Sequence, residues 1–286
     1  MEAALQVTDL TKTYPGFQLD HVSFTLPQGA IMGLIGENGA GKSTTIKAIL
    51  DLIRREDGTV TFWGQTLSDS KQLKEDIGVV FDQGSFYETL TPTQIGSISA
   101  AAYTQWNQSV YEGYLTRFAL PKNKALKSFS KGMRTKLGIA VALSHAPKLL
   151  ILDEATSGLD PVVREDILDV FWEFVQDEHH SILMSSHITS DLEKIADYIT
   201  FLHQGKLLFC KPKDELRYQY GVIRCGEAQF ARLNPSEILA YRREPYQIDV
   251  LVADKEAARR RHPGAVVDDA TIDDILLLYV KGERVK

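Results

Sequence analysis

GENGAGKST, at residues 36–44, matches the pattern G-x-x-x-x-G-K-[ST]. The short apolar run IMGLI (31–35) precedes it, and apolar residues at helical spacing follow Ser43. The sequence therefore predicts a strand, a glycine-rich loop and a helix in succession. Such a loop binds phosphate, because its backbone N–H groups and the positive end of the helix dipole surround an anion.

The residue types of this loop predict how it would hold a nucleotide. Its glycines let the backbone approach an anion closely. We expect Lys42 to reach the β- and γ-phosphates and Ser43 to offer its hydroxyl to Mg²⁺. The loop residues that we expect to bind ATP are Gly36, Asn38, Gly39, Ala40, Gly41, Lys42, Ser43 and Thr44.

A second chemical element lies in KLLILDEATSGLD, residues 148–160. An apolar run that ends in Asp153 is typical of a buried strand in a parallel sheet, where ligands collect at the carboxyl ends of the strands. We expect Asp153 to hold Mg²⁺, directly or through water. Glu154 would accept a proton from an attacking water or orient it. His187 follows another strand-type run, SILMSS, so we expect it to contact the γ-phosphate at the same edge.

The composition bounds the class of protein. The 286 residues, 44% of them hydrophobic, suffice for one large domain or for one domain with a small appendage. A net charge of −6 argues against general nucleic-acid binding, so we expect no nucleic-acid partner. The N-terminal residues lack a secretion signal, and no apolar run reaches the roughly 18 residues of a membrane span. Cys210 and Cys225 are not closely spaced, which predicts free thiols in a cytoplasmic protein.

The motifs together resemble the ATP-binding subunit of ABC transporters, over about residues 3–215. GENGAGKST corresponds to the Walker A loop, FSKGM (129–133) to the signature, LLILDE to Walker B and SGLD (157–160) to the D-loop, while His187 matches the switch histidine. The resemblance implies a P-loop NTPase cassette of the α/β class, with a mainly parallel sheet, an antiparallel β subdomain and a helical subdomain at about 84–140. We expect the cassette at residues 1–217.

The resemblance also implies partners and a shared site. In the family, two subunits pair head to tail, so Ser130, Gly132 and Asp160 of one subunit would reach the ATP held by the other. Tyr14 occupies the position where the family stacks an aromatic ring on adenine. The expected ligands are ATP and Mg²⁺. The expected partners are a second copy or a paralogous ATPase subunit, and a separate integral-membrane permease that would hold the chain at the cytoplasmic side of the membrane.

The sequence departs from the family pattern at two motifs. FSKGM has Lys131 and Met133 where the family has glycine and glutamine. By its spacing to the following aromatic residues, the family's Q-loop glutamine falls at Asp82, and Gln83 comes one residue later. Either side chain could contact Mg²⁺ or the attacking water, and the sequence leaves this choice open.

The function that these features favour is an ATPase that powers an exporter of peptides, antibiotics or other amphipathic compounds, since Ser-Lys-Gly-Met-Arg resembles that branch of the family. Three alternatives remain: the ATPase of an importer, an ABC-type ATPase in translation or DNA repair, and a P-loop small-molecule kinase. The translation and repair proteins carry two cassettes or a long coiled-coil insertion, and this sequence shows neither.

The last part of the sequence, 218–286, carries none of these motifs and predicts a small α+β accessory domain. GVIRC (221–225) and YQIDVLVAD (246–254) have the composition of strands. DDATIDDILLLYVKG (268–282) predicts a final helix, with Thr271 as its N-cap.

Overall fold

The computed structural model describes residues 2–68, 70–82 and 86–284. The chain divides into two compact units, Met1–Cys210 and Lys211–Lys286. The sequence places this division after residue 217, where the recognisable motifs end. The difference arises because α8 (Lys213–Gln219), which carries no motif, belongs to the second unit.

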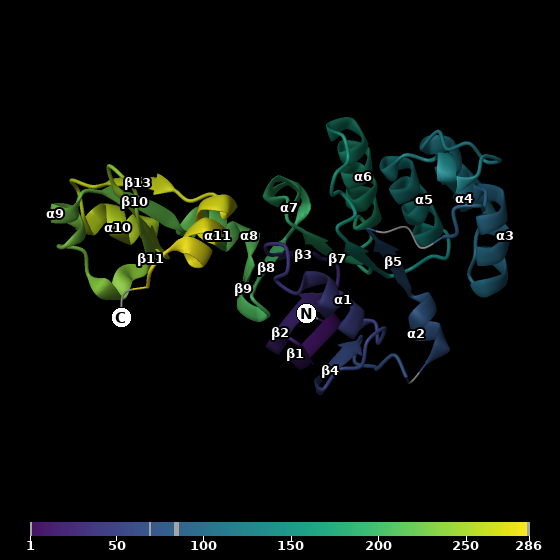
Figure 1. Ribbon diagram of the computed structural model, residues 1–286, viewed down its shortest axis with the longest axis horizontal. Coiled ribbons are helices and arrows are strands. Elements are labelled where there is room, and N and C mark those ends of the chain that lie inside the picture. Colours follow the sequence, from purple (N-terminus) through teal and green to yellow (C-terminus); the bar gives the residue numbers. More distant parts are fainter. Residues whose placement is uncertain (1, 69, 83–85, 285–286) are drawn as a thin grey trace. The chain divides into compact units, whose positions relative to one another are not determined.

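A six-stranded sheet forms the centre of the first unit, with the strand order β5-β6-β7-β3-β8-β9 (Figure 1). The strands from β5 to β8 in this order pair in parallel with their neighbours. Every residue of β3, β6 and β7 is buried, as in a sheet covered on both faces. The strands are β5 (Ile77–Phe81), β6 (Leu149–Asp153), β7 (Ser181–Ser186), β3 (Ile31–Ile35), β8 (Tyr198–His203) and β9 (Lys206–Pro212).

The register of this sheet brings several chain segments to one edge. Phe81 of β5 pairs with Asp153 of β6, and Asp153 pairs with Ser185 of β7. Ile35, at the end of β3, pairs with Ser186. Because the strands are parallel, the loops that follow β3, β5, β6 and β7 leave the sheet side by side.

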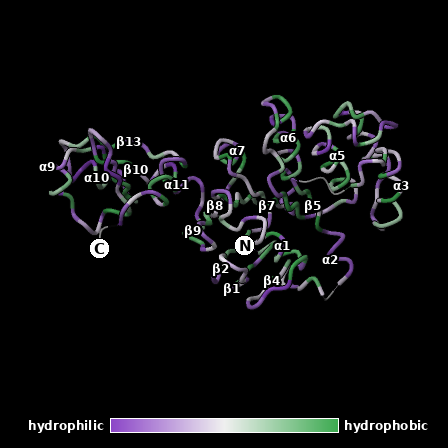
Figure 2. The backbone as a smooth tube through the Cα atoms, viewed as in Figure 1, coloured by the Kyte–Doolittle hydropathy of each residue, from purple (hydrophilic) through white to green (hydrophobic). Residues whose placement is uncertain are grey.

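Helices α1 (Lys42–Ile49), α6 (Pro161–Phe174) and α7 (Thr189–Ile195) follow strands of the sheet. Asp160 is the N-cap of α6, and Pro161 supplies the fixed backbone angle that suits a first helical turn. The helix buries Ile167, Leu168, Val170 and Phe171. Figure 2 shows the alternation of hydrophobic and hydrophilic residues along α6.

A three-stranded antiparallel sheet, with the order β2-β1-β4, makes a second layer of this unit. Its strands are β1 (Ala3–Tyr14), β2 (Phe17–Pro27) and β4 (Asp57–Phe62), and the short helix α2 (Lys71–Glu75) precedes β5. Its apolar side chains share one core with those of the central sheet; Leu5, Leu19 and Phe62 are buried together with Met32 and Ile151. This is the expected antiparallel β subdomain.

The expected helical subdomain contains α3 (Pro92–Ala102), α4 (Gln108–Arg117), the 3₁₀ turn η1 (Leu126–Ser128) and α5 (Lys131–Leu143). Side chains cap all three α-helices: Thr91 caps α3, Asn107 caps α4 and Ser130 caps α5. Tyr111 of α4 is buried and donates its hydroxyl to the carbonyl of Pro92 at 2.8 Å, which ties α4 to α3.

The second unit is a four-stranded antiparallel sheet with helices, in the order β11-β12-β10-β13. Thr271 is the N-cap of its last helix, as the sequence predicts. The elements after α8 are β10 (Gly221–Cys225), α9 (Glu227–Phe230), η2 (Pro235–Glu237), β11 (Ile238–Arg243), β12 (Ile248–Val252), α10 (Lys255–Arg261), β13 (Val266–Asp269) and α11 (Ile272–Lys281).

Two expectations from composition can be compared with the structure. Cys210 and Cys225 are both free thiols. Within the described ranges, none of the helices has both the length and the apolar character that crossing a bilayer requires.

Candidate phosphate-binding and catalytic site

The glycine-rich loop joins β3 to α1 and packs closely against β8. A Cβ added at Gly36 would lie 2.3 Å from the carbonyl oxygen of Leu202, so no larger residue fits there without a shift of the backbone. Gly39 and Gly41 have φ angles of 83° and 109°, in the left-handed region that glycine adopts at low cost. The local sequence thus folds into a narrow cradle whose shape depends on these three residues.

Lys42, the first residue of α1, directs its ammonium group back into this cradle. Its Nζ donates to the carbonyl oxygens of Gly36 at 2.7 Å and Glu37 at 3.3 Å, and lies 3.2 Å from Oε1 of Glu154. Only 6% of the Lys42 surface is exposed. A buried cation held by loop carbonyls and one carboxylate is available to the phosphates of a nucleotide at the same place.

Ser43 and Asp153, two of the residues expected to hold Mg²⁺, lie in direct contact. The Ser43 hydroxyl donates to Oδ1 of Asp153 at 3.0 Å. Ser185 donates to the same oxygen at 2.7 Å and also accepts the backbone N–H of Glu154 at 3.0 Å. A hydroxyl and a carboxylate are oxygen ligands of the kind that Mg²⁺ prefers, so this pair fits the metal.

Sequence reasoning missed Ser185. It stands in the strand run SILMSS, where a small polar residue gives no signal of its own. Its position opposite Asp153 comes from the pairing of β6 with β7, which joins residues far apart in the chain.

Glu154 and His187, the two residues expected to be catalytic, contact each other. Nδ1 of His187 lies 2.7 Å from Oε2 of Glu154, and the other Glu154 oxygen faces Lys42. Glu154 has a φ of 54°, an uncommon value for a residue with a side chain. The Glu154 carboxylate thus contacts Lys42 and His187, whereas the adjacent Asp153 carboxylate accepts from two serine hydroxyls.

A cavity of about 660 Å³ contains this site. Its size suits a small-molecule ligand. It is lined by Gly16, Phe17, Asn38, Gly39, Gly41, Lys42, Ser43, Thr44, Asp82, Glu154, Ser157 and His187. The cavity therefore brings the glycine-rich loop together with three of the residues expected to carry the chemistry, Asp82, Glu154 and His187.

Tyr14 is the aromatic residue that was expected to stack on the adenine of ATP. It is 40% exposed, with the Lys12 ammonium 5.2 Å from its ring centroid, and it is not among the described residues that line the cavity. Phe17, its partner across the β1–β2 pair, does line the cavity. Phe17 is thus a second aromatic candidate beside the adenine position, which the sequence analysis did not single out.

Ser130, Gly132 and Asp160 lie together at two helix N-termini, outside the cavity lining. Ser130 accepts the N–H of Met133 at 3.2 Å, and Asp160 accepts the N–H of Val163 at 3.0 Å. A Cβ added at Gly132 would lie 3.2 Å from Val163, so the starts of α5 and α6 adjoin. Their action on the ATP of a second copy stays a prediction.

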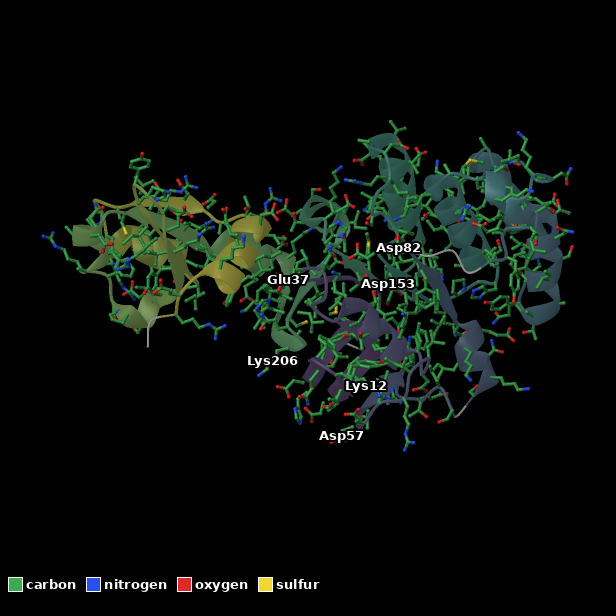
Figure 3. All side chains as sticks on the ribbon, in the orientation of Figure 1. Lys12, Glu37, Asp57, Asp82, Asp153 and Lys206 are labelled. Atoms are coloured by element: carbon green, nitrogen blue, oxygen red, sulfur yellow. The ribbon has the colours of Figure 1, made fainter. Side chains whose placement is uncertain are left out.

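Of the two candidates for the role of the Q-loop glutamine, Asp82 is the one that lies within the described residues. It lines the cavity that holds Lys42 and Glu154, and Figure 3 labels it together with Asp153. Its Oδ1 lies 2.5 Å from Nζ of Lys131. Gln83 lies outside the described residues.

Known proteins resemble this chain in both sequence and structure. The family model described as ABC transporter matches residues 19–157. The bacitracin transport ATP-binding protein BcrA of Bacillus licheniformis is 35% identical over 76% of this chain and 72% of its own length. The lantibiotic transport ATP-binding protein SrtF of Streptococcus pyogenes is 34% identical over 73% of this chain and 91% of its own.

A solved structure described as the ATP-binding subunit of an ABC transporter aligns with a TM-score of 0.65 and 30% identity. The alignment covers 75% of this chain and 92% of that one. These likenesses agree with the cradle, the parallel sheet and the helical subdomain found here. The chain therefore belongs to the ABC transporter family, as an ATP-binding subunit that hydrolyses ATP.

Proposed function

We propose that this ATPase powers the export of peptides, antibiotics or other amphipathic compounds through a separate membrane permease. The main support for the chemistry is one chain of contacts, in which Lys42, Glu154 and His187 meet beside Ser43 and Asp153. The cargo class rests on the relatives named for bacitracin and lantibiotic transport. An importer is the alternative direction.

In this proposal, the loop N–H groups and Lys42 bind the β- and γ-phosphates of ATP. Ser43 and Asp153 hold Mg²⁺, which neutralises charge on the phosphates when it is bound. Glu154 accepts a proton from the attacking water, and His187 orients Glu154 and contacts the γ-phosphate. Ser185 fixes the Asp153 carboxylate through the 2.7 Å hydrogen bond.

The proposed working form is a head-to-tail pair of ATPase subunits. Ser130 and Gly132 stand at the N-terminus of the 13-residue helix α5, where N–H groups and the helix dipole favour an anion. They lie outside the described lining of the chain's own cavity, which is consistent with action on a neighbour's nucleotide. The permease would hold this pair at the cytoplasmic side of the membrane.

The test of the catalytic assignment is Glu154→Gln, which keeps the shape of the side chain but removes its basicity. We expect ATP binding to persist and hydrolysis to fall by at least about 100-fold, the usual contribution of a general base. Glu165→Gln, on the exposed side of α6, is the control, because its side chain is 53% exposed and lies outside the cavity lining. Unchanged hydrolysis in the Glu154 variant would refute its role.

The test of the shared site mixes two inactive variants. Lys42→Ala removes the phosphate-binding cation, and Ser130→Asp keeps an N-cap while placing a negative charge where phosphate would bind. A head-to-tail heterodimer retains one intact site, so the mixture should regain ATPase activity that neither variant has alone. If Ser130→Asp alone hydrolyses ATP at the normal rate, the head-to-tail arrangement is wrong.

A further inference from the structure

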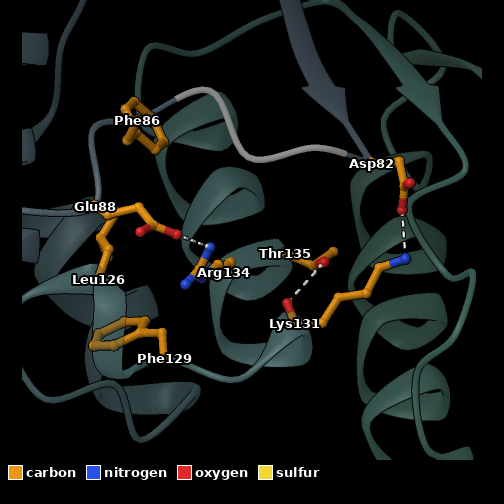
Figure 4. A pocket seen from close by; sticks show the side chains of 8 residues that line it. All are labelled: Asp82, Phe86, Glu88, Leu126, Phe129, Lys131, Arg134 and Thr135. Carbon is orange, nitrogen blue, oxygen red and sulfur yellow. Dashed lines mark hydrogen bonds and ion pairs between the residues drawn. The ribbon is translucent and has the colours of Figure 1, made fainter.

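Two of the positions at which this sequence departs from its family, Asp82 and Lys131, contact each other. Asp82, just after β5, and Lys131, the first residue of α5, form an ion pair with 2.5 Å between Oδ1 and Nζ (Figure 4). Each side chain is about half-exposed, at 39% and 44%. The contact joins the central sheet to the helix that carries Ser130.

Asp82 also stands between two cavities. It lines the 660 Å³ cavity that holds the glycine-rich loop, and it lines a second cavity of about 470 Å³. It is the residue common to both described linings. The second cavity is lined by Asp82, Phe86, Glu88, Leu126, Phe129, Lys131, Arg134 and Thr135.

The sheet register places Asp82 near the proposed metal ligands. Phe81 pairs with Asp153 in neighbouring parallel strands, which lie about 4.8 Å apart. Asp82 is the next residue beyond this pair, and it lines the same cavity as Ser43. One carboxylate can therefore serve a metal ion in the first cavity or the ammonium group that faces it from the second.

We propose that Lys131 is a positioning residue that competes with Mg²⁺ for the carboxylate of Asp82. This rests on the proposed metal site at Ser43 and Asp153. When the Asp82 carboxylate binds the metal instead, Lys131 loses the ion pair that joins the first turn of α5 to the end of β5. This removes one contact from the end of α5 that carries Ser130.

The surrounding charges allow this competition to be isolated. Arg134 lies one turn further along α5 and lines the same second cavity, but its Nη1 pairs with Glu88 at 2.8 Å (Figure 4). Removing Arg134 therefore changes the local charge equally without freeing Asp82. Exposed ion pairs stabilise by about 0.2–1 kcal/mol, which corresponds to a change of about 1.4- to 5-fold in an equilibrium constant.

The experiment measures binding of Mn²⁺, as a paramagnetic substitute for Mg²⁺, by electron paramagnetic resonance in the presence of ATP. All proteins carry Glu154→Gln so that the nucleotide persists. We expect Lys131→Met to tighten Mn²⁺ binding by about 1.4- to 5-fold, and more at low salt than at high salt. Lys131→Arg should restore the original affinity, and Arg134→Met should leave it unchanged.

Asp82→Asn completes the test, because it removes the shared carboxylate. In that background Lys131→Met should no longer change the Mn²⁺ affinity. The inference is overturned if Lys131→Met has no effect, if Arg134→Met has the same effect, or if the effect survives in Asp82→Asn. ATP binding without any ATP-dependent Mn²⁺ site would instead reject the proposed metal site itself, and the competition with it.

Discussion

Ser185→Ala should impair the site without any change to a residue expected to contact the nucleotide. The Ser185 hydroxyl donates to Oδ1 of Asp153 and accepts the N–H of Glu154, so one small side chain fixes two functional residues. Ser185 is fully buried, and alanine fills most of its volume. The change therefore removes two hydrogen bonds and leaves little space.

The expected loss of stability follows from the hydrogen bonds that Asp153 and Glu154 keep in the variant. Asp153 keeps the hydroxyl of Ser43 at 3.0 Å, and the Glu154 N–H keeps the Ser185 carbonyl at 3.2 Å. The main loss is one hydrogen bond to a charged carboxylate, which contributes about 1.5–3 kcal/mol. We expect the free energy of unfolding to fall by this amount. The Mg²⁺ concentration for half-maximal hydrolysis should rise at least about tenfold if Asp153 loses its orientation.

Ser181→Ala provides a matched control. Ser181 lies on the same strand and is equally buried, but it accepts the N–H of Gly29, at the other end of β7. Urea denaturation should show that both variants are destabilised, and Mg²⁺ titration of ATPase activity should separate them. Equal Mg²⁺ dependence in the two variants would show that Ser185 acts only through stability.

Two further predictions follow from individual side chains. Gly36→Ala should lower the free energy of unfolding by about 1–3 kcal/mol and weaken ATP binding, because the added Cβ would lie 2.3 Å from the Leu202 carbonyl oxygen. Gly113→Ala on α4 is the control, because a Cβ there meets open space. In the same urea denaturation assay it should stabilise the protein by up to about 1 kcal/mol. Burial lowers the pKa of His145 below its usual value of 6.5. As the pH falls, His145 is therefore protonated in the unfolded chain before it is protonated in the folded one. The free energy of unfolding should decrease as the pH drops below about 6.5. The slope should be at most about 1.4 kcal/mol per pH unit, and His145→Phe should reduce it; an unchanged slope in the variant would exclude His145 as its source.

The sequence was sufficient where a function depends on consecutive residues. The cradle at Gly36, Gly39 and Gly41 could be predicted because its glycines, Lys42 and the Ser43 hydroxyl all lie within residues 36–44. Asp153 could be placed because a buried apolar strand must end at the ligand-binding edge of a parallel sheet. In both cases local chemistry decides the position of the side chain.

The parts of the site that the sequence did not predict depend on contacts between segments that are distant in the chain. Ser185 reaches Asp153 only through the pairing of β6 with β7. Phe17 lines the cavity because β2 pairs with β1, which no local pattern reveals. The ion pair of Asp82 with Lys131 was likewise hidden, since these two departures from the family pattern lie in different motifs and meet only when the chain folds.

The left-handed backbone at Glu154 affects how inactive forms of this ATPase should be made. Its φ of 54° is costly for branched side chains, and asparagine tolerates it best among residues other than glycine. A valine or threonine at this position would remove the carboxylate and also strain the turn, in which the Glu154 carbonyl accepts the N–H of Ser157. Trapping experiments that compare unbranched replacements would separate the lost base from a distorted scaffold.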